Sequence, residues 1–312
     1  MSYSRGSFDL VGHNIIFIPE GYIDHLPPIN NIIIKATHTE EQWIEDVTKQ
    51  IGDWRAKLRS TYIHWSLAIN GLHIAAEKYA DPEWAKQHRF VVESLRPDDS
   101  VIANWDGQTA SEAHRKTVPM LTAFGIIDLY ANLEEVIFSL YRTYLNYHPN
   151  KILEGDDFKE LRQLQRQAET DASQRAVWEK AWQERLNRWH RKKLYDGLGK
   201  VFKAFCNSAA IKAPSTYEHT TVETWAEFIE IIALLRNALI HGATTVSEEL
   251  AAVCARPYAS TFDFTEGKPL VIHLYHLQGV DLFCEQLLTA LNLSLLELVY
   301  GSVGKNYYTY GG

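Results

Sequence analysis

An arginine, an asparagine and a histidine close an apolar stretch of this chain: Arg236, Asn237 and His241, followed by Gly242. A guanidinium group binds two phosphate oxygens at once and stabilises the charge that develops on them. An imidazole has a pKa near neutrality, so it can take up or release a proton during a reaction. These residue types together indicate cleavage of a phosphodiester without a metal ion.

The residues before this motif predict an amphipathic helix that begins near Val222, because apolar residues recur there at three- and four-residue spacing. Thr220 or Thr221 can cap its start. Gly242 suits a left-handed C-terminal cap, so His241 is expected in the last helical turn.

The helix geometry sets a problem for the motif. Asn237 and His241 share one face, but Arg236 lies about 140° away from His241 around the helix. Arg236 and His241 can bind one phosphate only if their side chains converge, or if a second copy of the helix supplies the missing group.

The Arg-Asn-x-x-x-His pattern near the end of a helix resembles the signature of the HEPN family of small α-helical domains. The order of the expected elements is similar as well: a long helix over 123–147, the motif helix, a short strand over 270–275 and a closing helix over 280–300. The resemblance covers roughly residues 119–300. It implies a mainly α fold, a HEPN-like helical bundle with a short β-hairpin, preceded here by an N-terminal region of two short strands and helices.

The resemblance also implies an activity. In HEPN-like ribonucleases the 2′-hydroxyl of RNA attacks the adjacent phosphorus and leaves a 2′,3′-cyclic phosphate. By this resemblance His241 is the general acid or base, and Arg236 binds the nonbridging oxygens. Asn237 orients His241 or the phosphate by hydrogen bonding. Glu134 is the acidic residue expected near the motif on the first helix. No metal or cofactor is implied.

The partners that the resemblance implies are RNA and a second copy of the chain, a homodimer whose two motifs face each other, or another HEPN-like chain. A role as a toxin or antiviral defence effector, held in check by a regulatory partner protein, follows from the family alone. The competing interpretation is a non-catalytic binding module that recognises a nucleotide, RNA or a partner protein. In that case Arg236 is a structural residue paired with Glu230 or Glu134, and Glu134 lies at the rim of the core.

A basic segment offers a second candidate for RNA binding. The formal net charge is −8, which counts against nonspecific coating of nucleic acid. Residues 159–193 nevertheless hold ten Lys or Arg against five acidic residues. The candidate RNA-binding residues are Arg185, Arg188, Arg191, Lys192 and Lys193. However, Trp178, Trp182 and Trp189 recur on one helical stripe, which favours a core-facing seam with the basic residues as a solvated face.

Composition predicts an ordered protein without a membrane span, and the simplest location is the cytoplasm. Hydrophobic residues make up 46% of the chain, but no uninterrupted apolar run of membrane length and no signal peptide is apparent. Cys206, Cys254 and Cys284 are widely spaced, so we expect reduced cysteines in the core rather than disulfides or zinc ligands.

The chain divides into four expected parts. Residues 1–100 form an N-terminal accessory or sensing region, 101–118 a linker, 119–300 the HEPN-like domain and 301–312 a flexible Tyr/Gly tail. In the first part we expect strands over 14–18 and 31–35, then helices after Thr39, over 62–79 and after Asp81, with residues 96–100 as the clearest linker segment. His273 and His276 alternate with apolar residues on the later strand, so we interpret them as structural.

Overall fold

The computed structural model describes residues 31–94, 101–259 and 261–301, which are mainly α-helical, as the sequence predicts. The longer helices are α1 (Gln42–Ala80), α3 (Gly107–Tyr147), α4 (Lys159–Thr170), α5 (Ala172–Lys193), α6 (Leu198–Ser208), α7 (Val222–Ile240) and α9 (Leu274–Tyr300). The shorter elements are the helices α2 (Pro82–Ala85) and α8 (Glu248–Cys254), the strands β1 (Phe90–Glu93) and β2 (Val101–Trp105), and the 3-10 turns η1 (Thr39–Glu41), η2 (Pro149–Ile152), η3 (Asp156–Phe158) and η4 (Pro257–Ala259).

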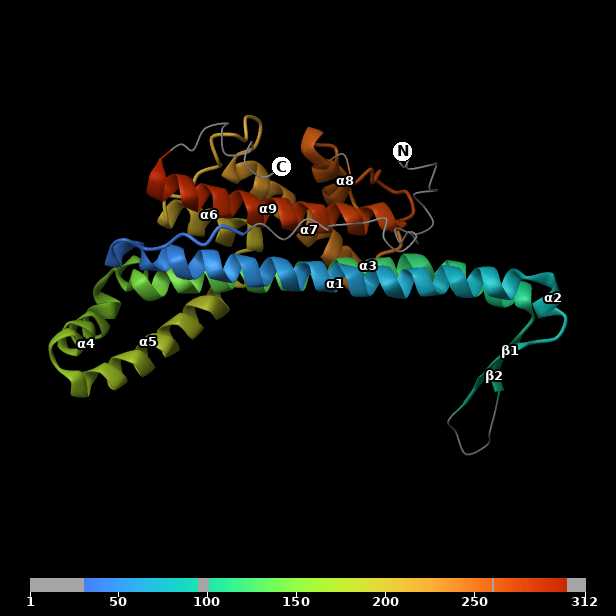
Figure 1. Cartoon of the computed structure of the whole chain (residues 1–312), viewed down its shortest axis with the longest axis horizontal. Helices are drawn as coiled ribbons and strands as arrows, with labels where there is room; N and C mark the ends of the chain where they lie inside the picture. The colour runs from blue at the N-terminus through green and yellow to red at the C-terminus, as the bar shows by residue number, and fades with distance from the viewer. Residues whose placement is uncertain (1–30, 95–100, 260, 302–312) are drawn as a thin grey trace, which may run out of the picture.

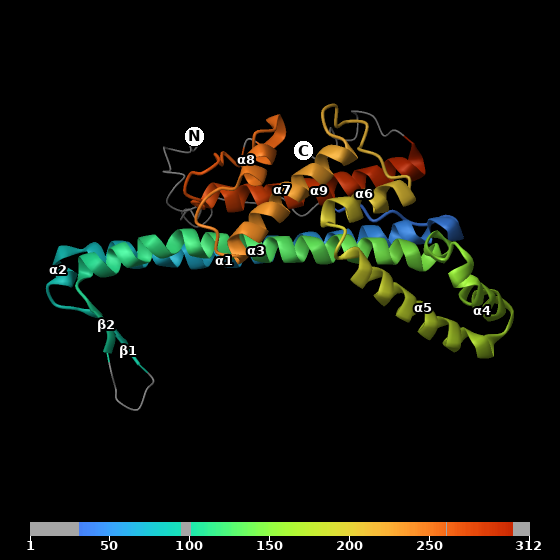
Figure 2. The same cartoon turned by 180° about the vertical axis from the view of Figure 1, so that it is seen from behind.

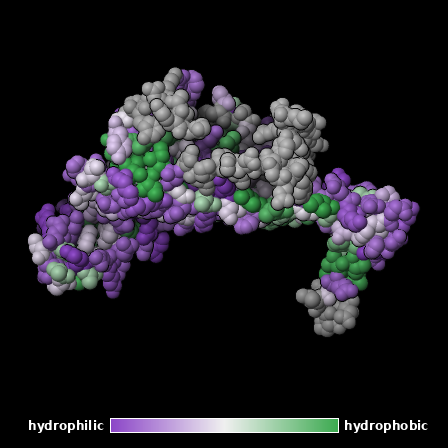
Figure 3. All heavy atoms as spheres, in the orientation of Figure 1, coloured by the Kyte–Doolittle hydropathy of each residue, from purple (hydrophilic) through white to green (hydrophobic). Residues whose placement is uncertain are grey.

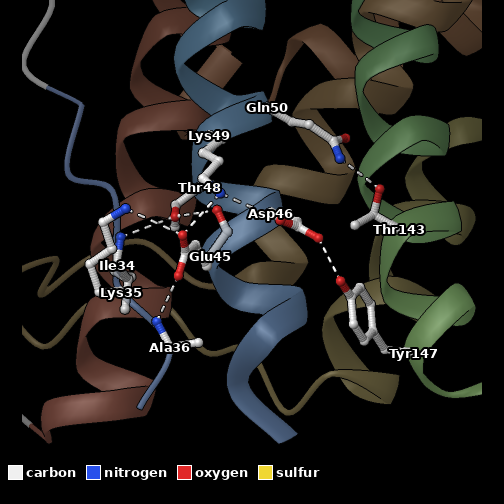
Figure 4. Close-up of polar contacts among 10 residues, drawn as sticks. All are labelled: Ile34, Lys35, Ala36, Glu45, Asp46, Thr48, Lys49, Gln50, Thr143 and Tyr147. Carbon is white, nitrogen blue, oxygen red and sulfur yellow. Dashed lines mark hydrogen bonds and ion pairs between the residues drawn. The ribbon is translucent and has the colours of Figure 1, made fainter. Parts of the chain in front are cut away.

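Two long antiparallel helices, α1 and α3, form the spine of the molecule (Figures 1 and 2). At a rise of 1.5 Å per residue, each is about 60 Å long. Polar side chains join the two helices at separate levels. Trp65 Nε1 donates to Asp128 Oδ2 at 2.9 Å. Gln50 Nε2 donates to Thr143 Oγ1 at 2.8 Å, as Figure 4 shows.

The helices of the N-terminal region differ from expectation. We expected one helix after Thr39 and a separate one over 62–79. This break is wrong, because α1 is continuous from Gln42 to Ala80. No glycine or proline lies between Leu58 and Tyr62, so nothing in the local sequence stops the helix there. Packing along α3 then stabilises its full length.

Residues 101–118, for which we expected a linker, form β2 and the first turns of α3. Strand β2 pairs with β1 as an antiparallel hairpin. Asp106 caps α3 by accepting the Thr109 N–H at 2.7 Å, and the helix continues through Pro119. The expected linker at residues 96–100 lies outside the described residues.

The core lies where α6, α7 and α9 pack on one side of the α1–α3 pair (Figures 1 and 2). Its fully buried side chains come from both halves of the chain and include Ile51, Leu133, Ile229, Ile232 and Leu287. Burial of each such side chain contributes about 1.5–3 kcal/mol. The helices on either side of the expected linker therefore share one core.

Helix α9 is the one described helix that is long and apolar enough to span a membrane, with a mean hydropathy of 1.5 over 18 residues. Half of that window is buried inside the protein. Asn292 makes two hydrogen bonds to the backbone of Ile32, accepting its N–H at 3.0 Å and donating to its carbonyl at 2.8 Å. Burial in the core accounts for the apolar character of α9.

The strand expected over 31–35 is wrong, and the one over 14–18 lies outside the described residues. Residues 31–36 precede α1 in the chain and form an extended segment without strand pairing that lies alongside this helix. Its backbone is satisfied by side chains instead. Thr48 Oγ1 accepts the Ile34 N–H at 3.1 Å and the Glu45 carboxylate accepts the Ala36 N–H at 2.9 Å (Figure 4). The latter bond, together with Lys49, lowers the pKa of Glu45 to about 2.

The strand expected over 270–275 is also wrong, because α9 begins at Leu274. The described residues after the motif contain an isolated bridge between Thr245 and Pro269, and the Leu270 N–H donates to the Thr244 carbonyl at 2.9 Å beside it. His276 is fully buried in the first turn of α9, where its Nδ1 accepts the His273 N–H at 2.9 Å. Burial lowers the pKa of His276 to about 4, so the ring is neutral at pH 7. His276 is structural, as expected, but on a helix.

The cysteine prediction is confirmed: Cys206, Cys254 and Cys284 are free and buried. Burial raises the pKa of all three thiols, that of Cys254 to about 11. A thiol that stays protonated at neutral pH is a poor nucleophile and metal ligand. These cysteines therefore act as core side chains.

The carboxyl group of Asp281 allows the burial of α9 to be tested. Burial raises its pKa to about 6, Glu285 acts in the same direction and Arg59 opposes it. Because the pKa is higher in the folded state than in the unfolded chain, this group lowers stability as the pH rises from about 4 to 6. Asp281→Asn is expected to raise the free energy of unfolding by about 1–2 kcal/mol at pH 8 and by less at pH 5. Urea titrations at the two pH values measure this, and an equal gain at both would contradict it.

Candidate functional site

Both predicted ends of the motif helix are confirmed. Thr221 caps α7 by accepting the Thr224 N–H at 3.2 Å, and Thr224 Oγ1 accepts the Thr221 N–H at 2.9 Å in return. Gly242 has the left-handed backbone conformation expected of a C-terminal cap, with φ at +66°. His241 is the C-cap residue, one position beyond the last helical residue.

The turn after His241 fixes the backbone position from which the imidazole projects. The N–H groups of Gly242 and Ala243 donate to the carbonyls of Leu239 and Ala238 at 3.1 and 2.9 Å, the double bond pattern of a Schellman motif. A Cβ at position 242 would meet nothing within 4 Å, so only backbone strain opposes a side chain there.

Gly242→Ala is accordingly expected to lower the free energy of unfolding by about 1–2 kcal/mol, the cost of a left-handed conformation for a residue with a Cβ. Chemical denaturation measures the change. Gly155→Ala is the matched comparison and is expected to lose a similar free energy of unfolding. Gly155 also has a positive φ and open space, but it lies far along the chain from the motif. A Gly242→Ala protein as stable as the wild type would show that the left-handed turn does not hold His241.

Arg236 faces α3, where it forms a cluster with two side chains of that helix. Its guanidinium carbon lies 5.6 Å from the ring centroid of Tyr130, and Nη1 donates to Asn237 Oδ1 at 3.0 Å. Burial raises the pKa of Glu134, and the nearby charge of Arg236 partly offsets this. Among the described residues neither Glu134 nor Glu230 forms an ion pair with Arg236 within 4.0 Å. The Tyr130 ring and the Asn237 amide thus hold Arg236, and the Glu134 carboxyl group lies close by.

Tyr130 is a site residue that the sequence analysis did not single out. Burial, followed by the charge of Glu134, raises the pKa of its hydroxyl to about 12. It therefore remains a neutral hydrogen-bond donor at neutral pH. The signal in the sequence was its spacing from Glu134, since residues four apart lie on the same face of a helix.

His241 stands apart from this cluster. Its side chain is exposed, whereas Arg236 is partly buried against α3. In the described part of the chain, no hydrogen bond or ion pair joins the imidazole to Arg236, Asn237 or Glu134. One chain therefore brings three of the four expected catalytic residues together and leaves the fourth pointing into solvent.

The aromatic residues of α5 face inward, which confirms the interpretation of a core-facing seam. Trp182 and Trp189 are buried, and Trp178 stacks on Trp182 with ring centroids 5.6 Å apart. Trp182 Nε1 donates to Asn146 Oδ1 at 2.9 Å, which joins α5 to the end of α3.

The five basic residues expected to bind RNA do not form one surface. Arg185 is partly buried, donates to the Ile152 carbonyl at 2.8 Å and lies 4.5 Å from the centroid of Phe158. Lys193 forms an ion pair with Asp196 at 2.6 Å. The remaining three residues are exposed on α5: Arg188, Arg191 and Lys192. Arg185 and Lys193 therefore brace the fold rather than extend the exposed basic face.

No protein-family model, curated protein sequence or solved structure matches this chain. The likeness to the HEPN family accordingly rests on the motif at the end of α7 and on the order of the helices around it.

Proposed function

We propose that this chain is a metal-independent endoribonuclease of the HEPN type, whose Arg236 and His241 convert RNA to products with 2′,3′-cyclic phosphate ends. The observation that supports it best is the arrangement at the end of α7. Arg236 is held beside Tyr130, Asn237 and Glu134, and the capping turn presents His241 to solvent. A held guanidinium and an exposed imidazole are the two groups that phosphate cleavage by the 2′-hydroxyl requires.

In this proposal His241 moves the proton of the 2′-hydroxyl or of the leaving oxygen. Arg236 stabilises the charge on the nonbridging oxygens, and Asn237 orients one of these groups. Glu134 helps to place Arg236. The protein acts in the cytoplasm, as a toxin or defence effector under the control of a partner.

The site is composite in this proposal, and a homodimer completes it. Arg236 is directed toward α3 while His241 is exposed, so a second chain must bring its histidine to the arginine of the first. An exposed apolar side chain beside the motif supports such an interface. Ile240 is 47% exposed next to His241.

A second candidate function is a non-catalytic binding module. The partial burial of Arg236 against Tyr130 favours it, because a structural arginine would have the same contacts. The net charge of −8 also opposes broad affinity for RNA.

A cleavage assay in excess chelator separates the two functions. Wild-type protein is expected to cut a structured RNA and leave cyclic phosphate ends. His241→Ala is expected to lower the rate by about 10²–10⁴, the usual contribution of a general acid or base. His64→Ala, which removes another exposed histidine, serves as the matched control. Cleavage that survives His241→Ala, or that chelator abolishes, would overturn the proposal, and an inactive wild type would favour the binding module.

A further inference from the structure

A polar cleft lies where α5 meets the α1–α3 pair. The α4–α5 hairpin extends from the side of this pair opposite α9 (Figures 1 and 2), and mostly hydrophilic residues cover it (Figure 3). The cleft is open and has a volume of about 340 Å³, enough for a small ligand or one nucleotide. Most of its lining residues are polar, including Arg142, His190, Glu135, Gln50 and Asn146, and Phe138 also lines it.

Hydrogen bonds join the side chains at the floor of the cleft. The Gln50 amide donates to Thr143 at 2.8 Å, as Figure 4 shows, and accepts from Ser139 Oγ at 3.1 Å. Gln50 thereby joins α1 to two successive turns of α3. A ligand in the cleft would meet this floor without having to reorganise it.

Arg142 supplies a positive charge without a counterion. Its Nη1 donates to Asn187 Oδ1 at 3.1 Å and its Nη2 to Gln183 Oε1 at 3.4 Å. These amide oxygens position the guanidinium but do not neutralise it. Within residues 31–94, 101–259 and 261–301, no carboxylate lies within 4.0 Å of it. A partly buried guanidinium with neutral partners is suited to bind an anion.

Two neutral donors line the same cleft. The His190 ring stacks on Phe138 with centroids 4.1 Å apart, and burial followed by the charge of Arg142 lowers its pKa. The neutral imidazole retains one N–H. Asn146 accepts the Trp182 N–H through Oδ1, which leaves its NH₂ group to donate elsewhere. Glu135 is the single carboxylate of the lining, and it opposes an anion.

The cleft and the motif both use residues of α3. Glu135 lines the cleft, and Glu134, the preceding residue, lies near the charge of Arg236. Because consecutive residues of a helix point about 100° apart, the two sites lie on different faces of α3. An RNA strand that occupies both must cross from one face of α3 to the other, whereas a lone anion would use either site separately.

We propose that the cleft between α1, α3 and α5 binds a nucleotide phosphate through Arg142, and that this phosphate belongs to the RNA strand held at Arg236 and His241. This inference rests on the proposed ribonuclease function for the identity of the strand. The binding chemistry alone also fits a free nucleoside monophosphate, so the experiment includes both ligands.

The experiment measures binding of a fluorescently labelled nine-nucleotide single-stranded RNA by anisotropy, and of AMP by calorimetry. All proteins carry His241→Ala so that the RNA stays intact. Arg142→Gln is expected to weaken RNA binding about tenfold or more, because it removes a charged contact to phosphate. Glu135→Gln is expected to strengthen binding severalfold, because it removes the opposing charge. Arg175→Gln, which removes an exposed cation of α5 outside the cleft, is expected to change binding less than twofold.

The two variants are expected to change the affinity for RNA in opposite directions. Misfolding cannot explain this result, since a destabilised protein does not bind more tightly. Tighter binding of RNA than of AMP supports the strand, and binding of AMP alone replaces it with a free nucleotide. Unchanged affinity in Arg142→Gln, weaker binding in Glu135→Gln, or no binding of either ligand by the parent protein would overturn the proposed cleft. If Arg142→Gln weakens binding while the protein with His241 intact never cleaves RNA, the cleft stands and the ribonuclease proposal fails.

Discussion

Arg236→Ala and His241→Ala proteins, each inactive alone, are expected to regain RNA cleavage when they are mixed. In a composite site, Arg236 of one chain acts with His241 of the other. A mixed dimer then has one site with both residues and one site with neither. Random exchange makes half of the dimers mixed, so the activity of an equimolar mixture is expected to reach about one quarter of the wild-type value.

The measurement is cleavage of a labelled RNA after unfolding and refolding the two variants together, which ensures that subunits exchange. A mixture of Arg236→Ala with Arg236→Ala/His241→Ala is the matched control, because no dimer in it has an intact pair. Equal and negligible activity in both mixtures would contradict a site that takes one group from each chain. Activity of either variant alone near the wild-type value would contradict the catalytic roles themselves.

Removal of the Glu285 carboxylate is expected to have the largest effect on stability. Glu285 on α9 accepts hydrogen bonds from Arg55 on α1, one of them from Nε at 3.1 Å. Its Oε1 also lies 3.6 Å from Arg59 Nη2. Arg55 is only 6% exposed. Glu285→Ala removes the carboxylate of this buried ion pair, so we expect a loss of about 3–5 kcal/mol in the free energy of unfolding. Denaturant titration at pH 7 measures it.

Two further variants test the cause of that loss. Glu266→Ala removes an exposed glutamate and is expected to change stability by less than about 0.5 kcal/mol. The pair Arg55→Met and Glu285→Leu removes both charges, and its loss is expected to be much smaller than that of Glu285→Ala. If the double variant is as unstable as Glu285→Ala, lost packing rather than the broken ion pair explains the effect.

Local signals in the sequence predicted the motif helix well. The capping threonine and Gly242 are short-range features, because each satisfies backbone groups within one turn of itself. The stripe of Trp178, Trp182 and Trp189 and the unclustered cysteines were equally readable, since periodicity and spacing fix which side chains one helix can bury together. The positions of Arg236 and His241 on different sides of α7 follow from the same geometry.

Contacts between distant segments decided the rest. Residues 31–35 and 270–275 have the composition of strands, but side chains of α1 and α9 satisfy the first segment, and α9 begins within the second. The length of α1 and α3 depends on the contact between the two helices. A short stretch of sequence from either helix does not contain this contact. Arg142 and Glu135 share a face of α3 in the sequence, but only the docking of α5 brings His190 to them.

The sequence by itself thus determined which residues of this protein can do chemistry and on which side of a helix each one lies, because helical spacing is a local property of the chain. Only the tertiary structure decided which of them meet. Tyr130 and Glu134 join Arg236 because α7 packs on α3. Arg142 and His190 line one cleft because α5 folds back onto α3. Burial and charge then set their pKa values, since both depend on neighbours far away in the sequence.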